Sequence, residues 1–217
     1  MLTPADPSEA RERMVERQIV ARGIKNARVI DAMRWVPRER FFPEAHQSLA
    51  FEDAAAPIGH GQTISQPYIV AYMTEALQVE TEHKILEIGT GSGYQAAILA
   101  KLGGEVYTVE RVKVLLDDAF ERLSTMKIRN VHFKFGDGSE GWPEKGPYDR
   151  IIITAATPAV ADTVLDQLAD GGICVAPVGN RDSQELVKFV KRNGRIERHS
   201  LLGVRFVPLL GTGGFSA

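Results

Sequence analysis

The chain has 217 residues, of which 44% are hydrophobic and 25% are charged, and its formal net charge at pH 7 is -2. This length and composition predict one globular domain with a sizeable apolar core, and they exclude a disordered or fibrous protein. The small net charge provides no broad positive field, so we expect no long nucleic acid as a partner.

The N-terminal third is predicted to be helical. Asp6 is a candidate N-cap with Pro7 at the first helical position, which predicts a helix that continues to Gly23. A second helix is predicted between Asn26 and Pro37, because apolar residues recur there at helical spacing.

Residues 41–66 show no sustained hydrophobic period and contain scattered prolines, glycines and aromatic residues. We interpret them as an ordered loop region, and long loops in compact domains often carry function. Ser65 lies at its end, just before the helix that is predicted to begin near Pro67. Two interpretations stay open at this point: Ser65 caps that helix, or its hydroxyl belongs to a site.

From Lys84 onward, short apolar strands alternate with longer amphipathic helices. This alternation is typical of an α/β fold with a doubly wound, mostly parallel, Rossmann-like sheet covered on both faces. The predicted strands are residues 84–88, 105–109, 131–135, 150–154 and 173–178. The predicted helices are residues 94–102, 112–126 and 159–169.

The C-terminal segment follows a different pattern. Residues 185–191 and 205–209 are predicted strands, and the turn Asn193-Gly194 lies between them with no intervening helix. We therefore expect an antiparallel hairpin to close the sheet.

Several features predict a cytoplasmic protein without a membrane partner. Residues 1–7 have no basic segment followed by an apolar one, and no apolar run in the chain reaches membrane-spanning length. Cys174 is the one cysteine, so neither an intrachain disulfide nor a cysteine-based metal site is expected. Its apolar neighbours predict a buried strand position.

The first predicted strand of the sheet runs into the glycine-rich loop Gly89-Thr90-Gly91-Ser92-Gly93. In a doubly wound sheet this loop lies where ligands bind. A dinucleotide fingerprint would require a small residue where Tyr94 stands, and the Gly-Lys-Ser/Thr of a P-loop is absent. The loop therefore indicates a ligand other than a dinucleotide or a nucleoside triphosphate.

Three carboxylates complete this pattern. Glu110 ends the second strand, where a carboxylate can accept hydrogen bonds from ribose hydroxyls. Asp137 and Gly138 end the third, where a carboxylate can accept from an adenine amino group. Glu87 lies inside the first strand and needs a partner, such as the loop backbone or a ligand ammonium. Together they favour a nucleoside with a cationic appendage, namely S-adenosylmethionine.

Residues 85–94 (ILEIGTGSGY), with Glu110 and Gly136-Asp137-Gly138, resemble the cofactor site of class I S-adenosylmethionine-dependent methyltransferases. Residues 57–67 (PIGHGQTISQP) and 204–209 (VRFVPL) resemble the more specific protein-L-isoaspartate O-methyltransferase family, and the match covers nearly the whole chain. The resemblance implies methyl transfer from S-adenosyl-L-methionine to the free carboxylate of L-isoaspartyl residues in damaged proteins and peptides.

The resemblance also implies which residues form the site, and it implies no metal. The cofactor-binding residues would be Glu87, Gly89, Gly91, Ser92, Gly93, Glu110, Asp137 and Gly138. The substrate-binding residues would be Ile64, Ser65, Arg205, Phe206 and Val207, with Ser65 as the catalytic group. Residues 1–217 would form one domain, in which residues 1–66 supply helices and a substrate loop and residues 67–217 the cofactor-binding core.

The chemistry needs no general base, because a free carboxylate with a pKa of roughly 3.3 to 4 is already ionised near neutral pH. Ser65 can donate to one carboxylate oxygen and leave the other to attack. His60 is expected to shape its loop, and Arg205 either pairs with the substrate carboxylate or faces solvent. Some relatives have a ligand-contacting threonine where this chain has Leu210, so that contact is not carried over.

Two alternatives stay open from the sequence. One is a methyltransferase that acts on a small molecule or RNA, although no basic stripe and no Pro-Pro-Tyr-type base pocket support it. The other is a nucleoside-binding module without catalysis. We expect a monomer whose partners are isoaspartyl-containing proteins and peptides.

Overall fold

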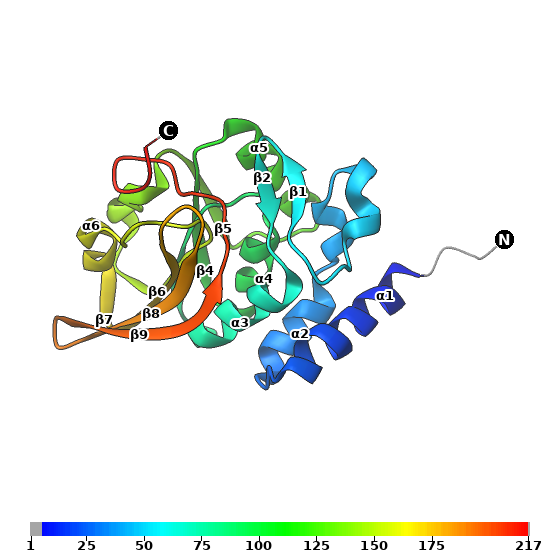
Figure 1. The fold of residues 1–217 in the computed structure, drawn as a ribbon, viewed down its shortest axis with the longest axis horizontal. Helices are drawn as coiled ribbons and strands as arrows, with labels where there is room; N and C mark the ends of the chain where they lie inside the picture. The colour runs from blue at the N-terminus through cyan, green and yellow to red at the C-terminus, as the bar shows by residue number, and fades with distance from the viewer. Residues whose placement is uncertain (1–5, 217) are drawn as a thin grey trace.

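A seven-stranded sheet is the central layer of the computed structural model, which describes residues 6–216 (Figure 1). The strand order is β5-β4-β3-β6-β7-β8-β9; β3 to β7 pair in parallel, and β8 and β9 are added antiparallel. The strands are β3 (Lys84–Ile88), β4 (Glu105–Glu110), β5 (Val131–Phe135), β6 (Tyr148–Ile153), β7 (Leu168–Gly179), β8 (Gln184–Arg192) and β9 (Arg195–Val204). The predicted fold class is confirmed.

The strand order reverses beside β3, which determines where a ligand can bind. The chain runs from β3 outward to β4 and β5 and then returns to β6 on the other side of β3. The carboxyl ends of β3 and β6 therefore border the crevice that binds ligands in sheets of this type. The loop at residues 89–93 follows β3, and Thr154 follows β6 and donates its N–H to Ile88 O at 2.9 Å.

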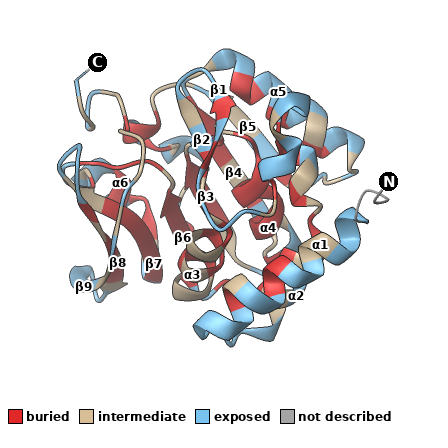
Figure 2. Cartoon of the chain, turned by 45° about the vertical axis from the view of Figure 1, so that its right-hand side comes forward, coloured by how far each residue is buried: buried red, intermediate tan, exposed pale blue. Residues whose placement is uncertain are grey.

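Helices cover both faces of the sheet, and successive strand residues point to opposite faces. Ile85 joins an apolar cluster with α3 (Pro67–Leu77), α4 (Tyr94–Leu102) and α5 (Lys113–Thr125). Leu86 joins a second cluster with the short α6 (Asp162–Asp166). Figure 2 shows the central strands β3, β6 and β7 as mostly buried between these layers, whereas β9 at the edge is exposed. The central strands are thus held from both sides, which fixes the edge where the glycine loop begins.

The N-terminal helices form as predicted. Asp6 accepts the N–H of Ser8 at 2.9 Å and caps α1 (Pro7–Met14), which continues through a π turn and a 3-10 turn to Arg22. Gly23 ends it with φ 93°. Asn26 accepts the N–H groups of Arg28 and Val29 and caps α2 (Ala27–Trp35). Residues 1–5 of the predicted signal-free start lie outside the described part of the chain.

The predicted loop region at residues 41–66 contains more structure than expected. Two 3-10 helices, η3 (Arg38–Phe41) and η4 (Glu44–Leu49), precede an antiparallel ribbon of β1 (Ala56–Gly59) and β2 (Gln62–Ile64). The ribbon is separate from the main sheet (Figure 1). Strands of three and four residues are too short to show alternation, so the hydrophobic pattern could not reveal them.

The predicted helix at residues 159–169 is largely wrong. Only α6 is helical, and Leu168 already pairs with Tyr148 as the first residue of β7. The preceding segment is tied to the sheet, because the N–H of Thr157 donates to Pro177 O at 3.0 Å. Tertiary hydrogen bonds at both ends thus outweigh the local helical pattern.

The predicted strand at residues 205–209 is also wrong. The chain turns at Asn193-Gly194 as expected, but the partner strand is β9 (Arg195–Val204). Its first six residues are exposed and all but Ile196 are polar, so they show no apolar alternation. Residues 205–209 instead run beside the segment after β6, where Ala156 N–H donates to Val207 O at 2.8 Å.

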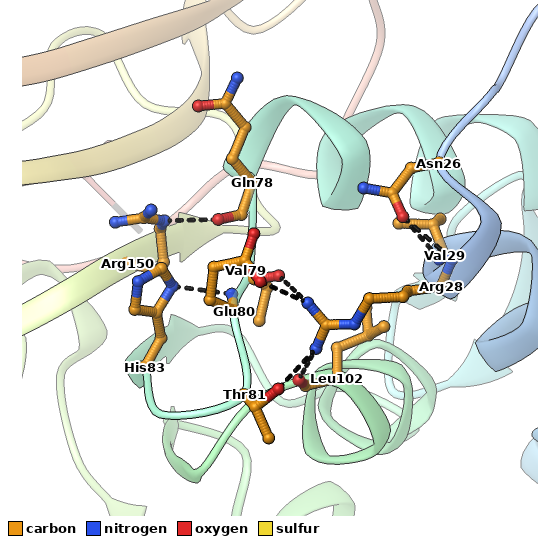
Figure 3. Close-up of polar contacts among 10 residues, drawn as sticks. All are labelled: Asn26, Arg28, Val29, Gln78, Val79, Glu80, Thr81, His83, Leu102 and Arg150. Atoms are coloured by element: carbon orange, nitrogen blue, oxygen red, sulfur yellow. Dashed lines mark hydrogen bonds and ion pairs between the residues drawn. The ribbon is translucent and has the colours of Figure 1, made fainter.

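Two arginines fasten the end of the sheet opposite the glycine loop (Figure 3). Arg28 donates from Nη1 to Val79 O at 2.9 Å and from Nη2 to Leu102 O, and so joins α2 to the segment before β3 and to the end of α4. Arg150 donates from Nε to Gln78 O at 3.1 Å. These bonds stabilise the amino end of β3, far from its ligand-binding end.

Within residues 6–216 no helix combines the length and the apolar character that crossing a membrane requires. Cys174 is free and buried in β7, as predicted, and burial raises the pKa of its thiol.

Candidate active site

The glycine loop has a backbone that only glycine adopts readily. Gly89, Gly91 and Gly93 have φ values of 97°, 52° and 86°, in the left-handed region. A Cβ added to Gly89 would lie 2.5 Å from Thr154 Oγ1, so this residue also passes too close to its neighbour for a side chain. Gly93 is the N-cap of α4. The loop is thus a tight connection between the sheet and α4, and it leaves its peptide groups close to any ligand.

Glu110 lies directly beside this loop, as its sequence position predicted. Its Oε2 accepts the N–H of Gly91 at 2.9 Å, and its Oε1 accepts those of Arg111 and Val112 at 2.8 and 2.9 Å. A carboxylate has about four lone-pair positions. One position therefore stays available for a ribose hydroxyl.

Asp137 is more fully engaged than the sequence suggested. Its carboxylate accepts from the backbone and hydroxyl of Ser139 at 2.9 and 2.7 Å and from those of Thr212 at 2.8 and 3.0 Å. Burial raises the pKa of Asp137, but the hydrogen bonds from Ser139 and Thr212 outweigh it, so the pKa lies below its ordinary value. An adenine amino group would have to replace one of these four bonds.

Glu87 is fully buried in β3, behind the loop. Thr108 Oγ1 donates to Glu87 Oε2 at 2.6 Å and is itself 2.6 Å from the hydroxyl of Thr90 in the loop. Glu87 Oε1 has no hydrogen-bond partner among residues 6–216. Burial raises the pKa of Glu87 to about 8; the Thr108 hydrogen bond opposes this rise, and the charge of Glu110 adds to it.

This raised pKa predicts a pH-dependent stability. In the unfolded chain Glu87 has an ordinary pKa near 4.5 and releases its proton above it, whereas the folded chain keeps the proton up to about pH 8. The contribution of Glu87 to the unfolding free energy is therefore fully present below pH 4.5 and is lost as the pH rises toward about 8. One pKa unit corresponds to about 1.4 kcal/mol. Glutamine does not titrate, so Glu87→Gln lacks this pH-dependent loss. From pH 5 to pH 8.5 the unfolding free energy of Glu87→Gln should rise by more than about 2 kcal/mol relative to that of the unmodified chain.

Urea unfolding of both proteins at the two pH values measures this difference. Glu82→Gln, at an exposed glutamate, is the matched control and should show no such gain. Parallel pH dependence of Glu87→Gln and the unmodified chain would show that Glu87 is ionised in the folded protein.

Ser65 is not the N-cap of α3. That position belongs to Gln66, and Pro67 follows at the first helical turn. The carbonyl of Ser65 accepts a hydrogen bond from Arg38, whereas its hydroxyl makes none within the described chain. The structure therefore removes the capping interpretation that the sequence left open.

Two neighbouring cavities meet at the β2 end of the ribbon. The first, the loop cavity, is lined by Gln62, Gly89, Gly91, Ser92, Glu110 and Val207 among others. The second, the outer groove, is lined by Gln66, Ile69, Gln184, Val204, Arg205 and Phe206 among others. Thr63 and Ser65 line both, so Ser65 lies at the boundary between them.

The remaining predicted residues divide between these spaces. Ile64 and Val207 line the loop cavity, whereas Arg205 and Phe206 line the outer groove. Gly138 lines a smaller cavity beside Glu110 with Leu209 and Leu210. His60 lies exposed at the turn of the β1–β2 ribbon, with φ 54°.

Comparison with known proteins decides the family. The profile of the family described as Protein-L-isoaspartate(D-aspartate) O-methyltransferase (PCMT) matches residues 9–214. The chain belongs to this family. A protein-L-isoaspartate O-methyltransferase of Methanoculleus marisnigri is 52% identical over 212 residues, which cover 97% of this chain and 96% of that protein. The resemblance predicted from the sequence is confirmed.

Solved structures with the same name share the fold of this PCMT family member. One protein-L-isoaspartate O-methyltransferase superposes with a TM-score of 0.84 at 29% identity, covering 94% of this chain and 67% of that one. A Plasmodium falciparum protein described as a putative PCMT in complex with S-adenosyl-L-homocysteine gives 0.80 at 26% identity, covering 92% and 98%.

Several residues around the site of this PCMT family member were not found from the sequence. Gln62 lines both the loop cavity and the smaller cavity beside Glu110. Gln184 is buried in β8, and its Oε1 accepts the N–H of Phe206 at 2.8 Å, so it holds the wall of the outer groove. Thr212 anchors the C-terminal segment on Asp137. Gln62 lies in the segment 57–67 but had no assigned role, whereas Gln184 and Thr212 belong to no local motif because they act across the fold.

Proposed function

We propose that this PCMT family member transfers a methyl group from S-adenosylmethionine to the free carboxylate of L-isoaspartyl residues in damaged proteins and peptides, which initiates their repair. The observation that carries the proposal is the place of Ser65 on the wall shared by the loop cavity and the outer groove. A carboxylate that enters along the groove meets the Ser65 hydroxyl at the border of the space beside the glycine loop.

The residues of the loop cavity suit S-adenosylmethionine. Its ribose would lie beside the buried Glu110, and the buried Glu87 lies behind the loop with an Oε1 that lacks a partner within the described chain. We assign the ribose hydroxyls to Glu110 and the adenine side to Gly138 and Asp137. Glu87 lines neither cavity, so we assign it the orientation of the loop through Thr108 and Thr90.

The reaction needs alignment more than acid-base catalysis. When bound, S-adenosylmethionine supplies an electrophilic methyl group on a cationic sulfur. The acceptor carboxylate is already ionised near neutral pH, so no group of the chain has to remove a proton. The task of Ser65 is to hold one carboxylate oxygen by a hydrogen bond so that the other faces the methyl group, and such alignment contributes to the rate.

The outer groove is assigned to the polypeptide around the isoaspartyl residue. Arg205 is exposed at its rim, whereas Phe206 is half-buried and held by Gln184. Ile64 and Val207 would form the apolar wall where the carboxylate enters. A groove open to solvent suits a flexible segment of a damaged protein better than a small molecule, which disfavours the small-molecule alternative.

The remaining assignments stay predictions from the sequence. They are a cytoplasmic location, a monomeric state, and the absence of nucleic acid and membrane partners. The formal net charge of -2 supports the prediction about nucleic acid, because phosphate contacts need a basic surface.

Ligand binding separates this proposal from a dinucleotide enzyme. We expect S-adenosylmethionine and S-adenosylhomocysteine to bind, and NAD not to bind, because Glu110 suits a ribose while the buried Tyr94 occupies the small-residue position of a dinucleotide turn. Calorimetric titration with each ligand measures this. Tight binding of NAD with no heat from either sulfur compound would overturn the cofactor assignment.

A further inference from the structure

Arg38 is a fully buried cation at the start of η3, next to the site but in neither cavity. Burying a charge is costly unless it is paired or hydrogen-bonded. Within residues 6–216 Arg38 has no carboxylate at ion-pair distance. Its guanidinium lies instead over the rings of Tyr94 and Phe42, with centroids at 4.7 and 5.4 Å, which compensates part of the lost hydration.

The hydrogen bonds of Arg38 all end on backbone carbonyls. Nε donates to Ala50 O at 2.8 Å and Nη2 donates to Ser65 O at 2.7 Å, while Nη1 has no partner in the described chain. One rigid group therefore joins the beginning of the β1–β2 region to its end. The guanidinium also packs on Tyr94, the first residue after the glycine loop. Arg38 therefore contacts both Ser65 on the acceptor side and the end of the glycine loop on the cofactor side.

We propose that Arg38 is a positioning residue that fixes the backbone of Ser65 and thereby aims its hydroxyl at the acceptor carboxylate. The inference rests on the proposed function. Ser65 needs such support, because its hydroxyl makes no hydrogen bond within the described chain and its residue lies between a short strand and a helix. A backbone held by a charged donor at 2.7 Å keeps the residue in place where local structure does not.

Arginine is required here by geometry. Its planar guanidinium presents donors in a fixed fork, so Nε and Nη2 reach two carbonyls in one plane. Lysine keeps the charge near the rings but offers a single ammonium on a flexible stem. Arg38→Lys therefore retains much of the packing and loses the simultaneous hold on Ala50 and Ser65.

The chain contains a matched control, Arg28 (Figure 3). It also bridges two backbone carbonyls, those of Val79 and Leu102, but at the opposite end of β3. Arg28 is 40% exposed and also pairs with Glu80, so Arg28→Lys reports the loss of a two-carbonyl hold without a change at Ser65.

The test is a double-mutant cycle of Arg38→Lys and Ser65→Ala. Turnover and KM are measured with an isoaspartyl peptide, S-adenosylhomocysteine affinity by calorimetry, and the folded fraction by circular dichroism. We expect Arg38→Lys to lower turnover about fivefold or more in the parent and less than about twofold in the Ser65→Ala background, since coupled residues are not additive. Affinity for S-adenosylhomocysteine and the turnover of Arg28→Lys should each stay within about twofold of the parent.

Equal loss of turnover in both backgrounds, or normal turnover of a folded Arg38→Lys protein, overturns the inference. If the unmodified protein transfers no methyl group to the peptide, the proposed function fails first. The positioning role is then decided by amide hydrogen exchange: Arg38→Lys must exchange faster than Arg28→Lys at residues 62–66, and equal exchange overturns it.

Discussion

Ser65→Ala is expected to lower the turnover number for an isoaspartyl peptide about tenfold or more, because about 1.4 kcal/mol of lost transition-state alignment gives that factor. The affinity for S-adenosylhomocysteine should change by less than about twofold, since the hydroxyl faces the acceptor. The melting temperature should hardly change, because Gln66 and not Ser65 is the N-cap of α3. Steady-state rates, calorimetry and thermal unfolding on one preparation measure all three quantities.

Ser124→Ala is a suitable control, because Ser124 is an exposed serine in α5. It should keep the full rate. A Ser65→Ala protein with the normal turnover number would show that the Ser65 hydroxyl has no part in the reaction, although Ser65 lines both cavities.

Glu110→Ala is expected to weaken S-adenosylmethionine binding by about 1 to 3 kcal/mol, the scale of hydrogen bonds to a charged group. The structure adds a second effect, because the carboxylate also accepts the N–H groups of Gly91, Arg111 and Val112. Removing it frees the glycine loop, so the unfolding free energy should fall as well. Calorimetry and urea unfolding measure the two losses.

Glu110→Gln separates these effects. Its amide oxygen can still accept on one side, while its NH₂ group faces an N–H donor on the other, so we expect an intermediate loss of affinity. Unchanged cofactor affinity in Glu110→Ala would restrict this residue to holding the loop and would remove it from the cofactor site.

The sheet and the glycine loop could be predicted because their signals are local. β3, β5 and α4 have the predicted bounds, since a glycine directly follows each of them. β9 could not be predicted, because its first six residues are exposed and show no apolar alternation. The helix predicted at residues 159–169 failed for the opposite reason: its periodicity is real, but long-range pairing of Leu168 with Tyr148 determines the structure.

The candidate site shows the same division. The loop, Glu110 and Ser65 stand out in the sequence because each follows a strand or precedes a helix. The partners that hold them do not: Arg38 reaches Ser65, and Thr212 reaches Asp137 across 75 positions. A sequence pattern identifies groups with available chemistry, whereas the groups that orient them depend on how distant segments meet.

Methyl transfer to matched peptides tests the account most directly. An isoaspartyl peptide and its aspartyl twin, identical in composition, are incubated with the chain and S-adenosylmethionine carrying a labelled methyl group. We predict label as a base-labile ester on the isoaspartyl peptide and only background on its twin. Equal labelling of the two peptides, or no labelling of either by a protein that binds the cofactor, would contradict the assignment of this site to isoaspartyl carboxylates.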